Sequence, residues 1–199
     1  MRQRHRSTLL AAAAVATVFA ASGASAAVRT DLHASDPIRA KRNNAAIAAS
    51  GVASMAHTRH ARALELDGDS RLMLIARKTD LDVRHHRYVQ TFRGLPIFGE
   101  HVIVAEDANG DIDTLFGRKV EGLASEIPAG KIRLDRKTAL AIAKTVVLGN
   151  RIGFMRTRNE SSDLMIYVND DGVARRAYVV SYFADTLGGG SPTRPTAIV

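Results

Sequence analysis

The sequence of 199 residues contains no cysteine and no tryptophan, and aromatic residues make up only 5% of it. The lack of cysteine excludes a disulfide framework, a thiolate metal site and a cysteine nucleophile, although it does not exclude export. Because aromatic rings are few, a core has to be built mainly from leucine, isoleucine, valine and alanine. The hydrophobic fraction of 46% and the charged fraction of 24% are ordinary for a globular protein of one medium domain or two small ones.

Common catalytic signatures are missing as well. No histidine is followed by glutamate, so the H-E-x-x-H motif, in which two histidines bind zinc and the glutamate acts as a base, is absent. The G-x-S-x-G elbow of serine hydrolases, the phosphate-binding P-loop and the dinucleotide fingerprint are absent too. We therefore predict that the chain is not an enzyme as it stands, with no catalytic residue, no metal ligand and no cofactor of its own.

Acidic residues are outnumbered, since 28 lysines and arginines face 20 aspartates and glutamates, for a net charge of +8. The first 26 residues hold three arginines and no acid, which leaves 25 basic and 20 acidic residues in the remainder. The basic residues are scattered and form no recognition module, so we do not expect a nucleic-acid partner. The charge leaves open a metal- or anion-binding surface protein as the third of three function hypotheses.

The N-terminus has the three-part pattern of a signal peptide. Residues Arg2 to Arg6 are basic, Leu9 to Ala21 form an apolar run, and Ala24-Ser25-Ala26 offers small residues for cleavage. The apolar run is too short for a membrane span, which needs about 20 residues. We predict a signal peptide over 1–26 with cleavage after Ala26, a secreted or periplasmic location, and no stable membrane anchor.

Strand-like runs come first in the rest of the chain, then a helix, then strand-like runs again. This order predicts an α+β fold of two small units, each made of antiparallel β-hairpins with helices packed on one face. We place a weakly structured segment at 27–63, the first unit at 64–127 and the second at 131–199. The first part of 27–63 is rich in alanine, and Pro37 could open a helix that continues through Ala45 to Ala49.

The clearest local signals are one hairpin and one helix. Two β-like runs flank Asn109-Gly110, which predicts a hairpin turn. The acids of Asp107 to Asp113 resemble a calcium loop, but the glycine comes fourth rather than sixth, and the twelfth residue is Arg118. We therefore interpret this stretch as a solvated turn. The region 131–149 predicts a helix with Asp135 as N-cap, Gly149 as stop, and an apolar face of Ala139, Ile142, Ala143, Val146 and Val147.

Two pairs of histidines are candidates for metal ligands. His57 and His60 have the closest spacing to a zinc motif, but no glutamate accompanies them and they fall in the segment predicted to be weakly structured. His85 and His86 are adjacent, so on a strand their side chains would point to opposite faces. We favour surface or pairing roles over metal binding for this second pair.

One stretch resembles a known family. Residues Arg87 to Glu100, RYVQTFRGLPIFGE, resemble the central motif of the fungalysin/thermolysin propeptide domain: an arginine, an aromatic and a glutamine, then a glycine four residues later. The hairpin VIVAEDANGDIDTLFG is similar to the same family. The helix from Asp135 and the strands LMIYVNDDGVARRAYVVSYF resemble the PepSY domain that follows it in such pro-regions. The tail resembles elastase- or vibriolysin-type bacterial members.

This resemblance implies a non-catalytic pro-region of a secreted thermolysin-like zinc metalloprotease, acting as intramolecular chaperone and inhibitor. Its partner would be the cognate catalytic domain, and zinc and calcium would be expected only there. Against the family pattern, we expect the chain to stop within the last PepSY strand, without that catalytic domain. The alternative hypothesis is a free-standing secreted or periplasmic inhibitor or binding module.

Five residues match the family motif: Arg87, Tyr88, Gln90, Gly94 and Gly99. We interpret them as building the domain rather than contacting the protease. The glycines would supply turn geometry, and Gln90 and Arg87 could hydrogen-bond to neighbouring backbone.

Overall fold

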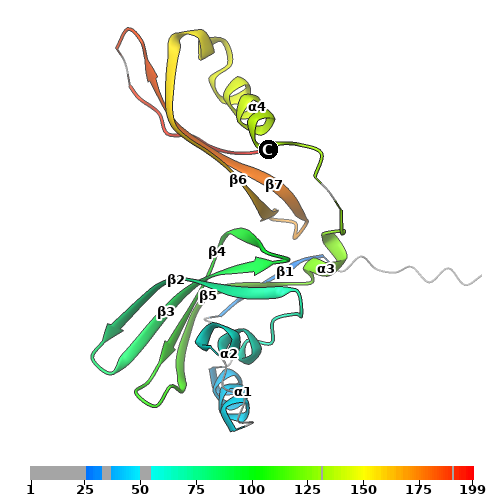
Figure 1. The fold of residues 1–199 in the computed structure, drawn as a ribbon, viewed down its shortest axis with the longest axis vertical. Helices are drawn as coiled ribbons and strands as arrows, with labels where there is room; N and C mark the ends of the chain where they lie inside the picture. Colours follow the sequence, from blue (N-terminus) through cyan, green and yellow to red (C-terminus); the bar gives the residue numbers. More distant parts are fainter. Residues whose placement is uncertain (1–25, 33–36, 50–54, 131, 190) are drawn as a thin grey trace, which may run out of the picture.

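The computed structural model describes residues 26–32, 37–49, 55–130, 132–189 and 191–199, and the fold is α+β, as predicted. Figure 1 shows two lobes, the first with β1–β5, α1 and α2 and the second with β6–β8 and α4. The strands are β1 (Val28–Asp31), β2 (Ser70–Asp80), β3 (Val83–Phe92), β4 (Leu95–Glu106), β5 (Ile112–Glu121), β6 (Met155–Val168), β7 (Ala174–Thr186) and β8 (Thr196–Ile198). The helices are α1 (Pro37–Ala49), α2 (Ala56–Ala63), α3 (Leu123–Glu126), α4 (Arg136–Leu148) and the 3-10 helix η1 (Gly149–Phe154).

Hydrogen bonding joins the eight strands into one curled sheet. In the first lobe β2, β3, β4, β5 and β1 pair in that order, each antiparallel to its neighbour. In the second lobe β6, β7 and β8 are antiparallel as well. A single parallel pair, Ile97 with Ile166, connects β4 to β6. Strand β4 of the first lobe therefore also pairs with a strand of the second lobe.

The predicted hairpin at Asn109-Gly110 is confirmed. Asp107 accepts hydrogen bonds at its side chain from the backbone N–H groups of Asn109 and Asp111, both at 2.9 Å. Its own N–H donates to the Asp111 carbonyl, and Gly110 N–H donates to the Asp107 carbonyl. The aspartate thus closes an Asx-type turn between β4 and β5, and its Oδ1 is occupied by two backbone donors.

The segment 27–63, predicted to be weakly structured, instead contains β1, α1 and α2. Helix α1 begins at Pro37 and runs through Ala49, as its proline and alanines suggested. The stability of this segment comes from tertiary packing rather than local propensity. Leu32, Ala40 and Ala63 are 5% exposed or less and pack into the first lobe's core.

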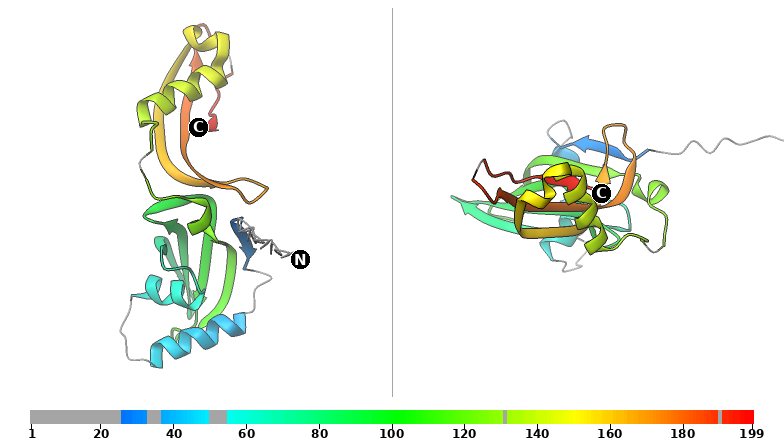
Figure 2. Two further views of the ribbon diagram at one scale, coloured as in Figure 1. Left: turned by 90° about the vertical axis from the view of Figure 1, so that its right-hand side faces the viewer. Right: turned by 90° about the horizontal axis from the view of Figure 1, so that it is seen from above.

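Helix α4 follows its local signals closely. The Asp135 side chain accepts from the N–H groups of Lys137 and Thr138, at 2.8 and 3.0 Å, and Gly149 ends the helix at φ +52°. The predicted apolar face is only partly correct, because Ile142 is 40% and Val146 76% exposed. Figure 2 shows α4 lying along the β6–β7 hairpin. Only the narrow strip of Ala139, Ala143 and Leu148 is buried there.

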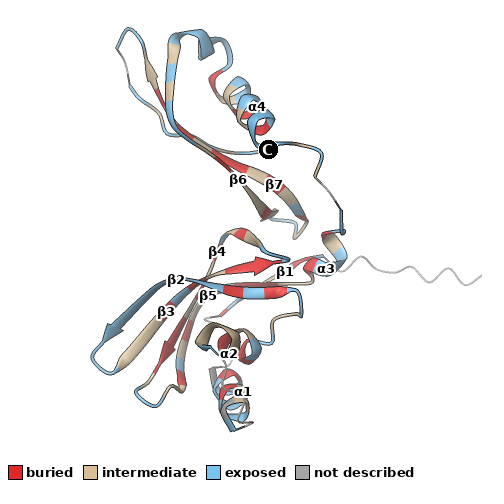
Figure 3. Cartoon of the chain, in the orientation of Figure 1, coloured by how far each residue is buried: buried red, intermediate tan, exposed pale blue. Residues whose placement is uncertain are grey.

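Three hydrophobic clusters make up the core, and buried positions run through both lobes in Figure 3. One lies under α1 and α2, and another lies under α4. The third joins the lobes, because it combines Phe92 and Ile97 of the first lobe with Ile166, Val168 and Ala174 of the second. We call this junction, where β1, the beginning of β4 and the end of β6 meet, the seam. The predicted unit boundaries at 127 and 131 stay a prediction.

Candidate functional site

A buried carboxylate ends strand β4. Glu106 is 2% exposed, and its two oxygens accept from His60 Nε2 at 2.9 Å and from His86 Nε2 at 2.7 Å. Arg59 forms an ion pair with the same carboxylate. The Tyr88 hydroxyl lies 2.8 Å from His60 Nδ1. These five residues form one connected polar network, which we call the Glu106 cluster.

Local structure explains how the cluster comes together. Side chains alternate between the two faces of a strand, so His86 and Tyr88 of β3 point to the same face, the one that α2 covers. Helix α2 contributes Arg59 and His60 from adjacent positions. The rings pack closely: His86 and Tyr88 are stacked with centroids 6.0 Å apart, and His60 meets His86 edge-on at 5.2 Å.

The hydrogen bonds select one tautomer of His60. Glu106 is an acceptor when ionised, so Nε2 of His60 carries the donated proton. In a neutral ring Nδ1 is then the acceptor, and the Tyr88 hydroxyl donates to it. His86 likewise donates from Nε2, but its Nδ1 is buried and has no partner among the described residues.

Burial and the nearest opposite charges shift the pKa values of Glu106 and His86 in opposite directions. Burial by itself would raise the pKa of Glu106, but the hydrogen bond and charge of His60, with the charges of Arg59 and His86, lower it to about 2. Burial lowers the pKa of His86 below its ordinary value, although Glu106 pulls it upward. Burial and the nearby Glu106 charge raise the pKa of Tyr88. At neutral pH the cluster is therefore an ionised carboxylate held by neutral and cationic donors.

The chemistry available to this cluster is limited. Both histidines use Nε2 on the same carboxylate, and in the described part of the chain no group of three or more histidine or acidic side chains could hold a metal ion. The Tyr88 hydroxyl is fully buried and committed to His60. The arrangement fastens α2 to the sheet, and it offers neither a nucleophile nor an open coordination position.

Beside the cluster lies a polar pocket of about 360 Å³, which we call the arginine pocket. Its lining comes from α1, α2, β2, β3, β4 and the β4–β5 turn, and comprises Asn44, Ala56, Arg59, Arg77, Arg84, His86, Glu106, Asn109, Gly110 and Asp111. The Arg59 Nε donates to Asn44 Oδ1 at 2.9 Å, and Asn44 Nδ2 donates to the Gly110 carbonyl at 3.1 Å. One wall of the pocket is thus fixed by hydrogen bonds.

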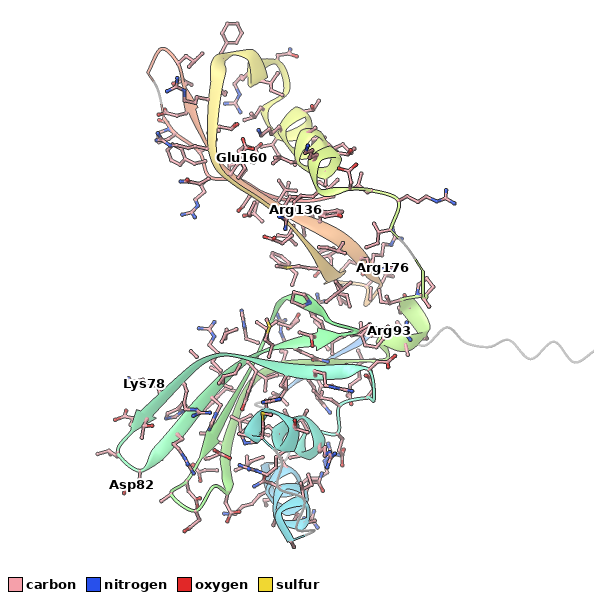
Figure 4. All side chains as sticks on the ribbon, in the orientation of Figure 1. Lys78, Asp82, Arg93, Arg136, Glu160 and Arg176 are labelled. Carbon is pink, nitrogen blue, oxygen red and sulfur yellow. The ribbon has the colours of Figure 1, made fainter. Side chains whose placement is uncertain are left out.

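Residues predicted from the family motif lie at different places around β3. Tyr88 is in the Glu106 cluster, whereas Arg87 is exposed on the opposite face of the strand. Gly94 forms a two-residue turn with Arg93, at φ +80° and +48°, between β3 and β4. Arg93 adopts this unfavourable conformation while donating to Asp69 Oδ2 and the Ile127 carbonyl, both at 2.8 Å. Figure 4 shows Arg93 beside α3.

Gln90 occupies a break in the sheet. The register of β3 and β4 shifts here, because Val89 pairs with His101 whereas Thr91 pairs with Pro96. The residues of β4 between these partners bulge away from β3, and Gly99 lies within the bulge at φ +77°. Glycine adopts this left-handed conformation without the steric penalty that other residues carry.

Where β4 bulges away, the Gln90 side chain takes the place of the β4 backbone beside β5. Its Oε1 accepts from Val120 N–H at 2.8 Å, and its Nε2 donates to the Val120 carbonyl at 2.7 Å. The carboxamide therefore bonds to β5 in the way that a neighbouring strand would. Because Gln90 is fully buried, these two bonds satisfy backbone groups that would otherwise lack partners.

This geometry coincides with a recognised sequence family, because residues 76–118 match the Fungalysin/Thermolysin Propeptide Motif. The predicted resemblance is confirmed for this segment, and the match takes in the end of β2, all of β3 and β4, the β4–β5 turn and most of β5. The PepSY resemblance of the second lobe stays a prediction.

Relatives of known type support the same assignment. The neutral protease of Vibrio proteolyticus is 30% identical over 111 residues, which is 55% of this chain and 18% of that protein. The hemagglutinin/proteinase of Vibrio cholerae serotype O1 is 27% identical over 110 residues, covering 55% of this chain and 17% of that protein. This chain thus spans less than a fifth of each relative. An uncharacterized protein from Eubacterium rectale aligns over 71% of this chain and 49% of its own, at a TM-score of 0.34 and 12% identity.

A second buried glutamate lies within the β4 bulge, next to Gly99. Glu100 is 2% exposed and pairs with Arg29 Nε at 2.7 Å and Arg118 Nε at 3.0 Å. Arg29, in β1, also donates to the carbonyls of Val168 and Asn169 at the end of β6. One arginine therefore connects β1, β4 and β6 at the seam.

Most of these contacts could not be predicted from local sequence patterns. His60 was noticed only for its spacing to His57, but it is completely buried in α2. His86 does have the predicted pairing role, and His85 lies on the other side of the strand. Glu106 was not singled out. One available signal was an acid at the end of an apolar run, where β-alternation places it on the core face.

Proposed function

We propose that this chain is the non-catalytic pro-region of a secreted thermolysin-like zinc metalloprotease, assisting the folding of the catalytic domain and inhibiting it before processing. The propeptide motif at 76–118 carries this proposal. The named proteases of Vibrio that share sequence with this chain support it. Export through the signal peptide predicted at 1–26 fits a secreted protease, and residues 1–25 of that segment lie outside the described residues.

A free strand edge offers a surface for the partner. Strand β2 pairs only with β3, so within the described ranges its other edge is open. Met73, Leu74 and Ile75 of this strand are 47%, 41% and 46% exposed. An open edge with apolar side chains is a natural template for pairing with another chain. Contact with a folding catalytic domain would cover this edge, and preferential binding to the native form would stabilise it by mass action.

The proposal assigns the catalytic metals to the partner. Zinc and calcium would belong to the catalytic domain, and this chain would supply a binding surface only. In the part of the chain that the structure describes, no helix combines the length and apolarity needed to cross a membrane.

The test is to refold a denatured thermolysin-like catalytic domain with and without the purified chain and to score the recovered peptidase activity. We expect a higher yield with the chain and a lower steady-state activity when the chain is in excess. A chain that is folded by circular dichroism but changes neither quantity would contradict the proposal.

The alternative is a free-standing secreted or periplasmic inhibitor or binding module. It is favoured by the separate hydrophobic cores under α1–α2 and under α4, because a chain with cores of its own can act in trans. Inhibition of the native protease without any gain in refolding yield would favour this second function. A coding sequence for H-E-x-x-H directly downstream would favour the first.

A further inference from the structure

The arginine pocket contains more positive charge than its own carboxylates balance. Arg59, Arg77 and Arg84 line it together with Glu106 and Asp111, which leaves one positive charge in excess. Arg77 forms no ion pair or hydrogen bond with any described residue. Arg84 lies 4.0 Å from Glu106 at its nearest approach, and its side chain is 43% exposed. Two of the three guanidinium groups therefore have donors available.

Two of the three guanidinium groups approach the same point. A methyl group placed on Gly110 would lie 3.7 Å from Arg84 Nη2 and 4.0 Å from Arg59 Nη2. The ends of these two side chains, one from β3 and one from α2, thus meet beside the same glycine of the β4–β5 turn. Arg77 belongs to the same face, because it is directly paired with His86 across β2 and β3.

A buried nitrogen without a partner lies beside the same pocket. His86 lines the pocket and is 2% exposed, yet its Nδ1 has no hydrogen-bond partner in the described part of the chain. Because His86 donates to Glu106 from Nε2, Nδ1 is the acceptor of the neutral ring, so this nitrogen indicates a bound water or another donor in the pocket, while the arginines supply the donors for an anion.

We propose that the arginine pocket binds a single carboxylate group, carried either by a small free anion or by an acidic side chain of a partner protein. One carboxylate neutralises the excess charge, and its two oxygens match the fork of donors that a guanidinium presents. The site does not depend on the pro-region proposal, because it is built entirely from side chains of this chain.

The chain provides a matched pair of variants to test this site. Arg77→Gln with Arg84→Gln removes two pocket charges. Lys78→Gln with Arg87→Gln removes two charges from the same two strands, but on the opposite face, since Lys78 and Arg87 alternate with the pocket residues. The β2 position of Lys78 is visible in Figure 4.

The experiment titrates the full chain with sodium acetate in one arm and with a capped peptide containing one aspartate in the other. Sodium chloride at equal ionic strength is the reference. The ¹H–¹⁵N NMR signals of Asn109 and Gly110 report on the pocket. We expect saturable shifts in at least one arm, about tenfold weaker binding in the pocket variant, and less than about a twofold change in the control variant.

The two arms separate the sources of the carboxylate. Saturation by acetate identifies a free anion as sufficient, and saturation by the peptide alone identifies a protein side chain. The proposal is overturned if chloride produces the same shifts, or if neither probe saturates. Equal binding by the two double variants would overturn it as well.

Discussion

Strand β4 carries two buried glutamates with the same exposure of 2% but different partners. Glu106 is bonded to His60 and His86, whose side chains are 0% and 3% exposed, and to Arg59. Glu100 is bonded to Arg29 and Arg118, whose side chains are 25% and 50% exposed. The first carboxylate is enclosed by the core, whereas the second is reached by side chains that extend to solvent.

The two glutamates therefore have different structural roles. Glu106 fastens α2 to the sheet within the first lobe, and its two histidine partners cannot turn to water if it is lost. Glu100 connects β1 and β4 at the seam, through an arginine that also bonds to carbonyls of β6. Since water can solvate the arginines around Glu100, its loss is the milder perturbation.

The largest effect is expected from Glu106→Gln. This change leaves Arg59 without its counter-ion next to two buried histidines, and breaking a buried pair in this way costs about 3 kcal/mol. Glu100→Gln, the matched change on the same strand, is expected to cost about 1 kcal/mol, because Arg29 keeps its carbonyl acceptors. Urea unfolding of both variants at pH 7.5 measures the difference. Equal losses would show that the two environments are energetically alike.

The next largest effect is expected from Gln90→Ala. The change leaves the N–H and carbonyl of Val120 buried without their partners, and unsatisfied groups of this kind cost about 2 kcal/mol together. Thr91→Ala, a truncation at the next position of β3, is the control, because its hydroxyl makes only one long bond of 3.5 Å. The urea concentrations at the unfolding midpoints of the two variants measure this difference. A smaller loss for Gln90→Ala than for Thr91→Ala would mean that its carboxamide does not replace a strand.

A smaller loss is expected at the β3–β4 turn. Gly94→Val forces a β-branched residue to φ +80°, which costs about 1–2 kcal/mol even though no atom lies in the way. Arg87→Ala removes an exposed side chain and should change stability by less than about 0.5 kcal/mol. Equal melting temperatures for the two variants would count against this account of the turn.

These local effects are also the ones that sequence reasoning anticipated best. Asp135 and Gly149 mark the ends of α4 because caps act on neighbouring backbone, and Asn109-Gly110 sets its hairpin for the same reason. The Glu106 cluster was missed because its members are up to 47 residues apart, and no local pattern encodes that contact. The order in helices α1 and α2 was underestimated because their stability depends on burial against the sheet, which composition alone does not reveal.

The smallest effect is expected from pH, and the shifts at His86 and Glu106 have the same sign. The pKa of His86 is lowered in the folded chain, so the unfolded chain binds more protons and stability is lost as pH falls below about 6.5. Because the pKa of Glu106 is lowered to about 2, a further loss of stability is expected as the pH falls from about 4.5 to about 2. We expect the urea midpoint to fall from pH 8 to pH 5.5 in the parent chain and to fall less in His86→Gln. A parallel fall in both would exclude His86 as the source.

The most direct test of the division between the two glutamates is amide hydrogen exchange of Glu106→Gln and Glu100→Gln, compared with the parent chain. Local opening exposes the amides of whichever element has lost its support. We predict faster exchange in α2 for Glu106→Gln, with β6 and β7 unchanged. For Glu100→Gln we predict faster exchange in β1 and at the end of β6, with α2 unchanged. Acceleration of the same amides in both variants would contradict the account and would mean that the two lobes open as one unit.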